Sequence, residues 1–233
     1  MSAIFKREFR SYFTAPLGYV YVAFVLFFEG LGFALTYKGS GTDLTAVFSI
    51  LPMVFAIMVP VLTMRMLSED RKLKVDQALI TAPIKVSGIV MGKFFAAFAV
   101  YALPFIPTVL FQLIIASKVA TNWLLYFNCL LGALLLGAAL IAIGMFISSL
   151  TESTVISCIL TLTIFLVLTL ITSLASFTGV EWIASAAEYF ALFDKLASFT
   201  ETVFHVTDIV HMLSVTVVFC FLSVRAVERR RWA

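Results

Sequence analysis

Long apolar stretches alternate with short polar segments along nearly the whole chain. A helix needs about 20 mostly apolar residues to cross the hydrocarbon core of a bilayer. By this measure the sequence predicts six membrane-spanning helices, at residues 17–37, 46–66, 89–117, 124–149, 154–176 and 207–226. Because these helices use most of the 233 residues, we expect residues 1–233 to form one all-α membrane domain with no separate soluble domain.

The composition excludes a soluble globular protein, and the charge pattern predicts an orientation. Apolar residues make up 62% of the chain and charged residues only 12%, too few to cover a soluble protein of this length. With an even number of spans both termini share one side, and of the 16 Lys and Arg residues only Lys38, Lys118 and Lys195 fall on the other. Cytoplasmic loops carry the excess of cations, so both termini are predicted to be cytoplasmic. The net charge of +3 therefore reflects topology and gives no indication of a nucleic-acid partner.

The longest polar interruption, residues 66–93, predicts a cytoplasmic helix between the second and third spans. Ser68 is a suitable helix cap, and Glu69 and Asp70 follow it where a helix N-terminus favours acidic residues. Pro83 ends the helical pattern, so we expect an amphipathic helix over residues 68–82. A charged helix held on the membrane surface is typical of a docking site for another protein.

Two further segments mix apolar and charged residues but are too polar to span. In residues 2–14, aromatic residues alternate with charged ones, which favours a helix in the interface with its cations toward anionic headgroups. Ordinary orienting charges ahead of the first span explain this pattern equally well. In the outer segment 177–206, apolar residues at three-residue spacing predict one or two short amphipathic helices that dip into the outer leaflet. These residues are Phe190, Phe193, Leu196 and Phe199.

Polar residues inside two of the spans are candidates for a pathway or for a contact between subunits. Glu29 lies near mid-depth of the first span, where a carboxylate costs roughly 2.5–3.5 kcal/mol. It is therefore either a pathway residue in a cavity or a neutral carboxyl bonded across a helix interface. The fifth span carries a row of hydroxyls, Ser157, Thr161 and Thr172, which favours a neighbouring helix or an aqueous path over lipid. We expect two copies of the chain to pair through the first and fifth spans, with this row at the midline.

The sequence contains no pattern that predicts an active site. Gly88-x-x-x-Gly92-Lys93 resembles a phosphate-binding loop, but it has one residue too few between the glycines and no Ser or Thr after the lysine. We interpret it as a packing motif. The 3 cysteines all fall inside spans, which argues against a disulfide framework or a zinc site. We expect the chain itself to bind no cofactor or metal and to catalyse no reaction.

The polar segment carries a resemblance to a known family. Ser68-Glu69-Asp70-Arg71-Lys72 and the following Asp76-Gln77-Ala78-Leu79-Ile80-Thr81-Ala82-Pro83 are similar to the coupling region E-x-x-x-x-T-x-x-x-L-L-x-T-x-P of ABC-2 type permeases. Residues 149–153 resemble the family's second cytoplasmic turn, and residues 208–214 and 228–232 resemble its last span and tail. Within the family, the chain looks most like the gliding-motility (Gld) and copper-maturation (Nos) permeases.

This resemblance implies a permease subunit of an ATP-driven (ABC) transporter in a bacterial cytoplasmic (inner) membrane. Such a subunit pairs with a second copy or with a homologous permease, and two separate ATPase subunits, which bind ATP and magnesium, dock beneath the pair. Hydrolysis by those subunits is coupled to export of a substrate. The resemblance places the ATPase contact on Glu69, Asp70, Arg71, Asp76, Gln77, Leu79, Thr81, Pro83 and Glu152.

Two other functions stay open on the sequence alone. The chain could pass ATP-driven motion to a periplasmic partner without transporting a substrate. It could also be a secondary transporter, although such proteins normally show paired intramembrane charges or broken helices in both halves. Here Glu29 is the one charge at depth, and no inverted repeat is visible.

Overall fold

The computed structural model describes residues 2–39, 43–72, 86–178, 191–201 and 205–230, and among these residues it contains helices and no strands. The all-α prediction is therefore confirmed for the part of the chain that the structure describes. The helices are α1 (Ser2–Thr14), α2 (Leu17–Lys38), α3 (Thr45–Thr63), α4 (Ser68–Lys72), α6 (Val86–Ala102), α7 (Phe105–Ala116), α8 (Trp123–Leu150), α9 (Thr154–Thr178), α11 (Lys195–Ser198) and α12 (Val206–Arg230).

Five helical stretches in the described residues are long and apolar enough to cross a membrane. They are Leu17–Lys38, Thr45–Lys72, Val86–Ala116, Trp123–Leu150 and Val206–Arg229, and they correspond to the first, second, third, fourth and sixth predicted spans. The helix α9 occupies the place of the fifth, but its described side chains end at Leu170, and Thr154–Leu170 counts only as a shorter apolar helix. The count of six spans remains a prediction.

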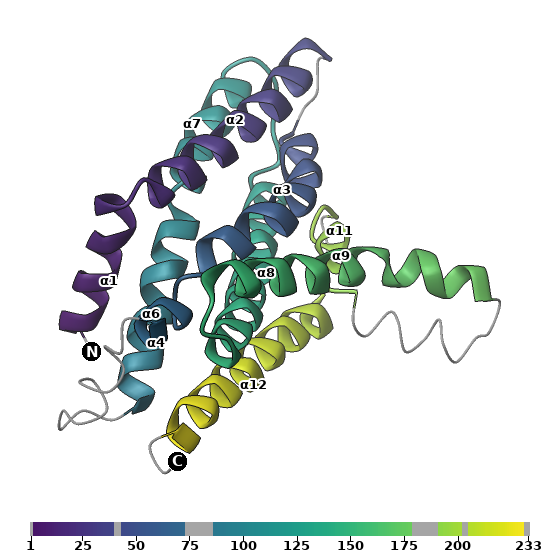
Figure 1. The fold of residues 1–233 in the computed structure, drawn as a ribbon. Helices are drawn as coiled ribbons and strands as arrows, with labels where there is room; N and C mark the ends of the chain where they lie inside the picture. The colour runs from purple at the N-terminus through teal and green to yellow at the C-terminus, as the bar shows by residue number, and fades with distance from the viewer. Residues whose placement is uncertain (1, 40–42, 73–85, 179–190, 202–204, 231–233) are drawn as a thin grey trace.

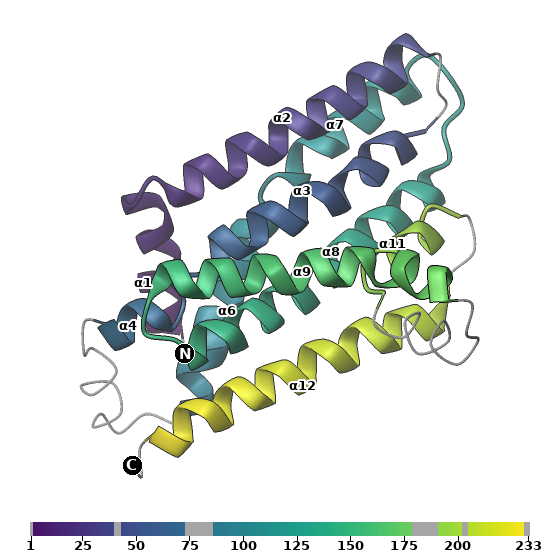
Figure 2. The ribbon, with the colours of Figure 1, turned by 45° about the vertical axis from the view of Figure 1, so that its right-hand side comes forward.

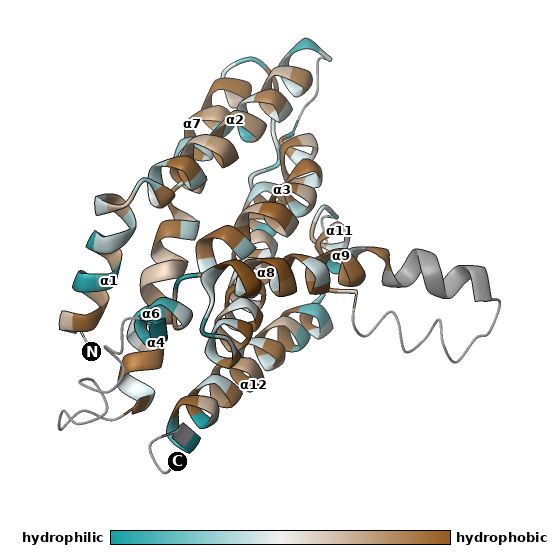
Figure 3. Ribbon diagram, in the orientation of Figure 1, coloured by the Kyte–Doolittle hydropathy of each residue, from teal (hydrophilic) through white to brown (hydrophobic). Residues whose placement is uncertain are grey.

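The helices form one elongated bundle with α8 at its centre (Figures 1 and 2). In the most apolar window of α8, 72% of the residues are buried, against 22% to 56% in the other candidate spans. The helix α12 runs along α8, and α2 runs along α3. Brown, apolar residues cover the bundle in Figure 3, as the predicted membrane environment requires. Both marked chain ends lie at the same end of the bundle, which we call the terminal end and which also holds α4 (Figure 2).

Small residues on α8 allow the neighbouring helices to pack closely, as is common between membrane helices. A Cβ atom added at Gly137 would lie 2.1 Å from the ring of Tyr101 on α6, and one at Gly144 would lie 2.3 Å from Oγ1 of Thr63 on α3. The phenol of Tyr101 in turn donates a hydrogen bond of 2.7 Å to the carbonyl of Ala133. These contacts leave no room for a larger side chain on this side of α8.

The third predicted span is two helices rather than one. The helix α6 ends at Ala102, and α7 begins at Phe105, directly after Pro104. Proline has no N–H to donate to the preceding turn and its ring clashes with that turn, so the helix is interrupted at this point. The predicted third span over residues 89–117 is therefore built from two helices, and α6 and α7 together are long enough to span.

A helix, α1, is present with the bounds expected for the N-terminal helix, whose place in the membrane interface stays a prediction. It turns away from α2 and packs across α6 (Figures 1 and 2). Ile4 is buried, and Phe9, Tyr12 and Phe13 pack against the core of the bundle. Part of the apolar side of α1 is thus covered by protein instead of lipid.

The outer segment before the last span differs from its prediction. Its described helix, α11, is only 4 residues long, and Phe193, Leu196 and Phe199 are buried against the bundle. Phe199 lies over Gly132 of α8, and Asn128 donates a hydrogen bond of 2.9 Å to the carbonyl of Glu201. The apolar row therefore faces the protein, and the depth of this segment in the outer leaflet stays a prediction. Phe190 lies outside the described residues.

Candidate functional site

The helix α4 begins one turn after α3 at the terminal end, and its first backbone groups are held by α8. The hydroxyl of Ser148 accepts hydrogen bonds of 3.1 Å from the N–H groups of Leu67 and Ser68, and it donates one of 3.2 Å to the carbonyl of Met64. The first N–H groups of a helix have no partner within the helix, so Ser148 stabilises α4 by supplying one. The start of α4 is thereby fixed to the end of α8.

The predicted amphipathic helix over residues 68–82 is described only over Ser68–Lys72. The remaining predicted coupling residues lie outside the described part of the chain. These are Asp76, Gln77, Leu79, Thr81 and Pro83.

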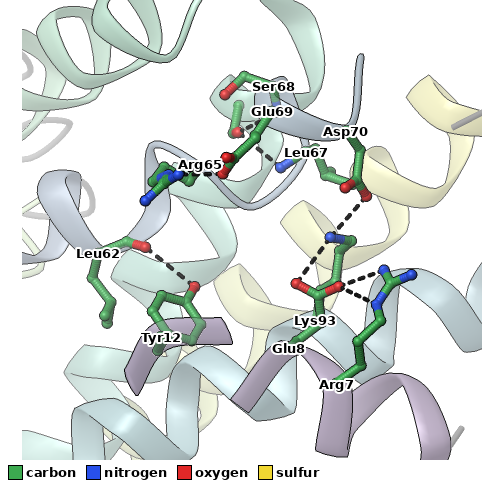
Figure 4. A network of polar contacts seen from close by, with 11 residues as sticks. Arg7, Glu8, Tyr12, Leu62, Arg65, Leu67, Ser68, Glu69, Asp70 and Lys93 are labelled. Carbon is green, nitrogen blue, oxygen red and sulfur yellow. Dashed lines mark hydrogen bonds and ion pairs between the residues drawn. The ribbon is translucent and has the colours of Figure 1, made fainter. Parts of the chain in front are cut away.

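One buried lysine joins three helices at this end of the bundle (Figure 4). The side chain of Lys93, on α6, is only 2% exposed, and its Nζ lies 2.8 Å from Oδ2 of Asp70 on α4 and 3.2 Å from Oε2 of Glu8 on α1. A buried ammonium is costly unless it is paired, so these two carboxylates stabilise it in place. We call Glu8, Asp70 and Lys93 the Lys93 site.

Two further interactions of α1 lie beside the Lys93 site: a pair within the helix and a hydrogen bond to α3. The guanidinium of Arg7 donates two hydrogen bonds, of 2.6 and 3.1 Å, to Oε1 of Glu8, and this interaction raises the pKa of Arg7 above its ordinary value. The phenol of Tyr12 donates a hydrogen bond of 3.2 Å to the carbonyl of Leu62 on α3. Burial raises the pKa of Tyr12, so the phenol stays neutral and remains a donor.

Glu69 and Arg71 of α4 are also paired within the chain. Glu69 accepts two hydrogen bonds, of 2.7 and 2.5 Å, from the guanidinium of Arg65, one helical turn away. Arg71 lies 3.1 Å from Glu152 in the turn between α8 and α9, and it also donates to the carbonyl of Ser149. Glu69, Asp70 and Arg71 thus connect α4 to the rest of the bundle instead of pointing freely outward.

This pairing changes what the sequence suggested about an ATPase contact. The side chains of Asp70 and Arg71 are each 18% exposed, whereas that of Glu152 is 77% exposed. Lys72 is also exposed. Among the described residues, Lys72 and Glu152 are therefore the charges at this place that a partner protein can reach most directly.

Sequence reasoning missed Glu8, Lys93 and Ser148. Lys93 was interpreted as part of a packing motif, yet a lysine within an apolar stretch requires a counter-ion when it is buried. Glu8 and Asp70 are among several acids predicted on the same side of the membrane. The sequence signal therefore indicates that Lys93 needs an acidic partner, but it does not identify which acids.

The polar residues predicted inside the spans are buried within the chain where the structure describes them. Ser157 and Thr161 are fully buried, and the Thr161 hydroxyl donates a hydrogen bond of 2.7 Å to the carbonyl of Ser157 within α9. The exposed side of α9 carries Val155, Ile156 and Ile159 instead. The prediction that Ser157 and Thr161 face a second subunit therefore disagrees with their burial, and the side chain of Thr172 lies outside the description.

Glu29 is fully buried on α2, and neither carboxyl oxygen has a hydrogen-bond partner among the described residues. The alternative of a carboxyl bonded across a helix interface is thus not what the described residues show. An unpaired carboxylate inside the hydrocarbon region is costly, so this environment favours the neutral acid.

The described side chains contain no group of three His, Cys, Asp or Glu residues placed to hold a metal ion. What the Lys93 site and its neighbours offer is mechanical: ion pairs and hydrogen bonds that hold α4 against α1, α6 and the α8–α9 turn. A force applied to α4 therefore acts on several helices at once.

Comparison with known protein families gives a match over most of the chain. A family model described as "ABC-2 family transporter protein" matches residues 12–222 of the 233. The matched range contains α4, Lys93 and the turn with Glu152. A search of the curated proteins finds no match to the chain.

Proposed function

Because the chain belongs to the ABC-2 transporter family, we propose that it is the transmembrane permease subunit of an ABC transporter complex that exports a substrate. Two separate ATPase subunits bind ATP and magnesium in this proposal, and the terminal end of the bundle faces them in the cytoplasm of a bacterium. The cation excess on that side supports this orientation.

The observation that carries the proposal is the way α4 is held. Asp70 connects it to α6 and α1 through Lys93, Arg71 connects it to the α8–α9 turn through Glu152, and Ser148 holds its first turn. A short charged helix of this kind, bonded to four neighbours, has the connections needed to pass a movement of an attached ATPase into the membrane bundle. We propose that the ATPase contacts α4 and the segment that follows it.

The complex in this proposal contains a second permease, either another copy or a homologous chain. The exposed apolar side of α9, with Val155 63%, Ile156 53% and Ile159 59% exposed, is the surface that we propose for this contact. It replaces the buried hydroxyl row as the candidate seam.

Purification from native membranes tests the proposal. The tagged chain, extracted in mild detergent, is expected to recover an ATPase with nucleotide-binding motifs, identified by mass spectrometry, and the chain freed of that partner is expected to hydrolyse no ATP. Lys72→Glu combined with Glu152→Lys reverses two exposed charges beside α4 and is expected to reduce the recovered ATPase several-fold.

The matched control is Arg225→Glu with Glu228→Lys, which reverses an exposed ion pair of 3.1 Å on α12 at the same end of the bundle. Exposed pairs such as Arg225–Glu228 contribute about 0–1 kcal/mol, and Lys72 and the side chain of Glu152 are exposed, so both double variants should fold. Equal recovery of the ATPase with both variants would place the docking surface elsewhere. ATP turnover by the chain alone, or a purified complex that lacks any ATPase, would contradict the permease proposal itself.

A further inference from the structure

The helix α1 presents three different rows of side chains. On its inner side Ile4 is buried, and Glu8 bonds Lys93. Beside this side runs a row of aromatic rings, Phe5, Phe9 and Phe13, with ring centroids 5.9 and 5.2 Å apart. The row continues to Tyr19 at the start of α2, whose ring lies 5.3 Å from that of Phe13.

The third row consists of Lys6 and Arg10. Both side chains are exposed, and neither forms an ion pair or a hydrogen bond with any described residue. At about 100° per residue, these two cations lie one turn apart, next to the aromatic row and on the opposite side of the helix from Glu8. Arg7 differs from them because its guanidinium is occupied by Glu8.

We propose that Lys6 and Arg10 bind the phosphate groups of anionic phospholipids in the leaflet next to the terminal end, and that this contact sets the position of α4 through the Lys93 site. The exposed cations complement the negative charge of such headgroups. Helices that lie in the membrane interface carry Lys and Arg on one face and apolar residues such as Phe on another, as α1 does. A helix that packs across α6 and carries both rows is placed to lie in that interface.

The Lys93 site supplies the connection to α4. Glu8 and Asp70 belong to different helices, and one ammonium, only 2% exposed, contacts both. A shift of α1 moves Glu8, and Lys93 then either follows Glu8 or stays with Asp70. In both cases the ionic contact between α1 and α4 weakens, so lipid that fixes α1 also fixes α4. The role of α4 in coupling to an ATPase rests on the proposed function. The lipid contact and its effect on α4 do not depend on that role.

Lipid binding is tested with the purified full chain in vesicles of phosphatidylcholine alone or of equal parts phosphatidylcholine and phosphatidylglycerol. Spin-labelled phosphatidylglycerol reports the fraction of lipid immobilised by the protein. A basic residue near an anionic surface gives about five-fold tighter association, so Lys6→Gln with Arg10→Gln is expected to lower the preference for the anionic lipid by up to roughly 30-fold at low salt. The same variant should leave the association of spin-labelled phosphatidylcholine unchanged.

The control variant is Arg225→Gln with Arg229→Gln. These cations are also one turn apart and exposed at the terminal end, but Arg225 is already paired with Glu228. A much smaller loss of lipid preference is expected for it. The proposal is overturned if the α1 variant keeps the wild-type preference, or if the α12 variant loses as much, because the attraction would then be a general property of the cationic side.

The effect on α4 is measured by hydrogen exchange of the Ser68–Lys72 amides in the same two kinds of vesicle, with no ATPase present. Phosphatidylglycerol is expected to slow this exchange in the wild type and not in the Lys6 and Arg10 variant. Glu8→Gln should keep the preference for the anionic lipid, but phosphatidylglycerol should no longer slow the exchange of the α4 amides. Glu8→Asp has a side chain too short to reach Lys93 and is used instead if Glu8→Gln cannot be purified. Equal exchange in both lipids for the wild type, or unchanged slowing in the Glu8 variants, would refute the transmission. A failure to recover an ATPase contradicts only the proposed function.

Discussion

Replacing Lys93 by methionine removes the ammonium of the Lys93 site and leaves a side chain of similar length. The two carboxylate oxygens lie within 3.2 Å of Nζ, so they are at most about 6 Å apart, and at an effective dielectric constant of about 20 they repel by roughly 3 kcal/mol once the cation is gone. Breaking a buried ion pair by removing one partner costs about 3–5 kcal/mol. We therefore expect Lys93→Met to lower the free energy of unfolding by about 3 kcal/mol.

For a chain of this size, 1 kcal/mol corresponds to about 2–4 °C in the melting temperature, so the expected loss is roughly 6–12 °C. The free cysteines Cys129, Cys158 and Cys220 allow unfolding to be followed in detergent with a thiol-reactive dye. Lys93→Met with Asp70→Asn removes the repulsion as well and should recover much of the loss, while Lys72→Met, at an exposed site, should change little. A melting temperature of Lys93→Met equal to that of the wild type, or no recovery in the double variant, would refute the reasoning.

Two further predictions concern packing. Gly137→Ala places a Cβ atom 2.1 Å from the ring of Tyr101 and should destabilise the chain by about 1–3 kcal/mol. At Gly88 an added Cβ atom has nothing within 4 Å, so Gly88→Ala should leave the melting temperature unchanged or slightly higher. Equal effects of the two variants would contradict the packing described for α8. In a background without native cysteines, Ile159→Cys should crosslink between two permeases and Thr161→Cys should not, and the reverse result would restore the hydroxyl row as the seam.

Much of the fold could be predicted because membrane spans depend on a simple requirement, about 20 apolar residues in a row. The bounds of α2, α8 and α12 lie within a few residues of the predictions at one or both ends. Hydropathy could not reveal the break between α6 and α7, since Pro104 lies within a long apolar stretch and acts through its missing N–H. Nor could it show that Phe199 faces Gly132, because a row of apolar residues suits lipid and protein equally.

The sequence predicts a charged helix at residues 68–82, but it does not predict the contacts that the described part of this helix makes. The pair of Arg65 and Glu69 follows from their i, i+4 spacing, which brings side chains together on any helix. The contacts of Lys93 with Glu8 and Asp70 join residues far apart in the chain, and no local pattern specifies them. Because no local pattern specifies such contacts, the sequence suggests that Glu69 and Asp70 bind a partner protein. In the structure they pair with Arg65 and Lys93 of the same chain.

The break after Ala102 divides the third crossing into two pieces with different attachments. The lower piece, α6, carries Lys93 and packs against α1, whereas the upper piece, α7, packs against α2, where the rings of Phe33 and Phe111 stack with centroids 4.6 Å apart. A continuous helix would act as a rigid lever across the full thickness of the membrane. If the chain works as we propose, a joint at this point lets α6 tilt without tilting α7 on the opposite side of the membrane. The movement of α6 would then pass sideways to the helices that it contacts, among them α8, where Tyr101 lies against Gly137.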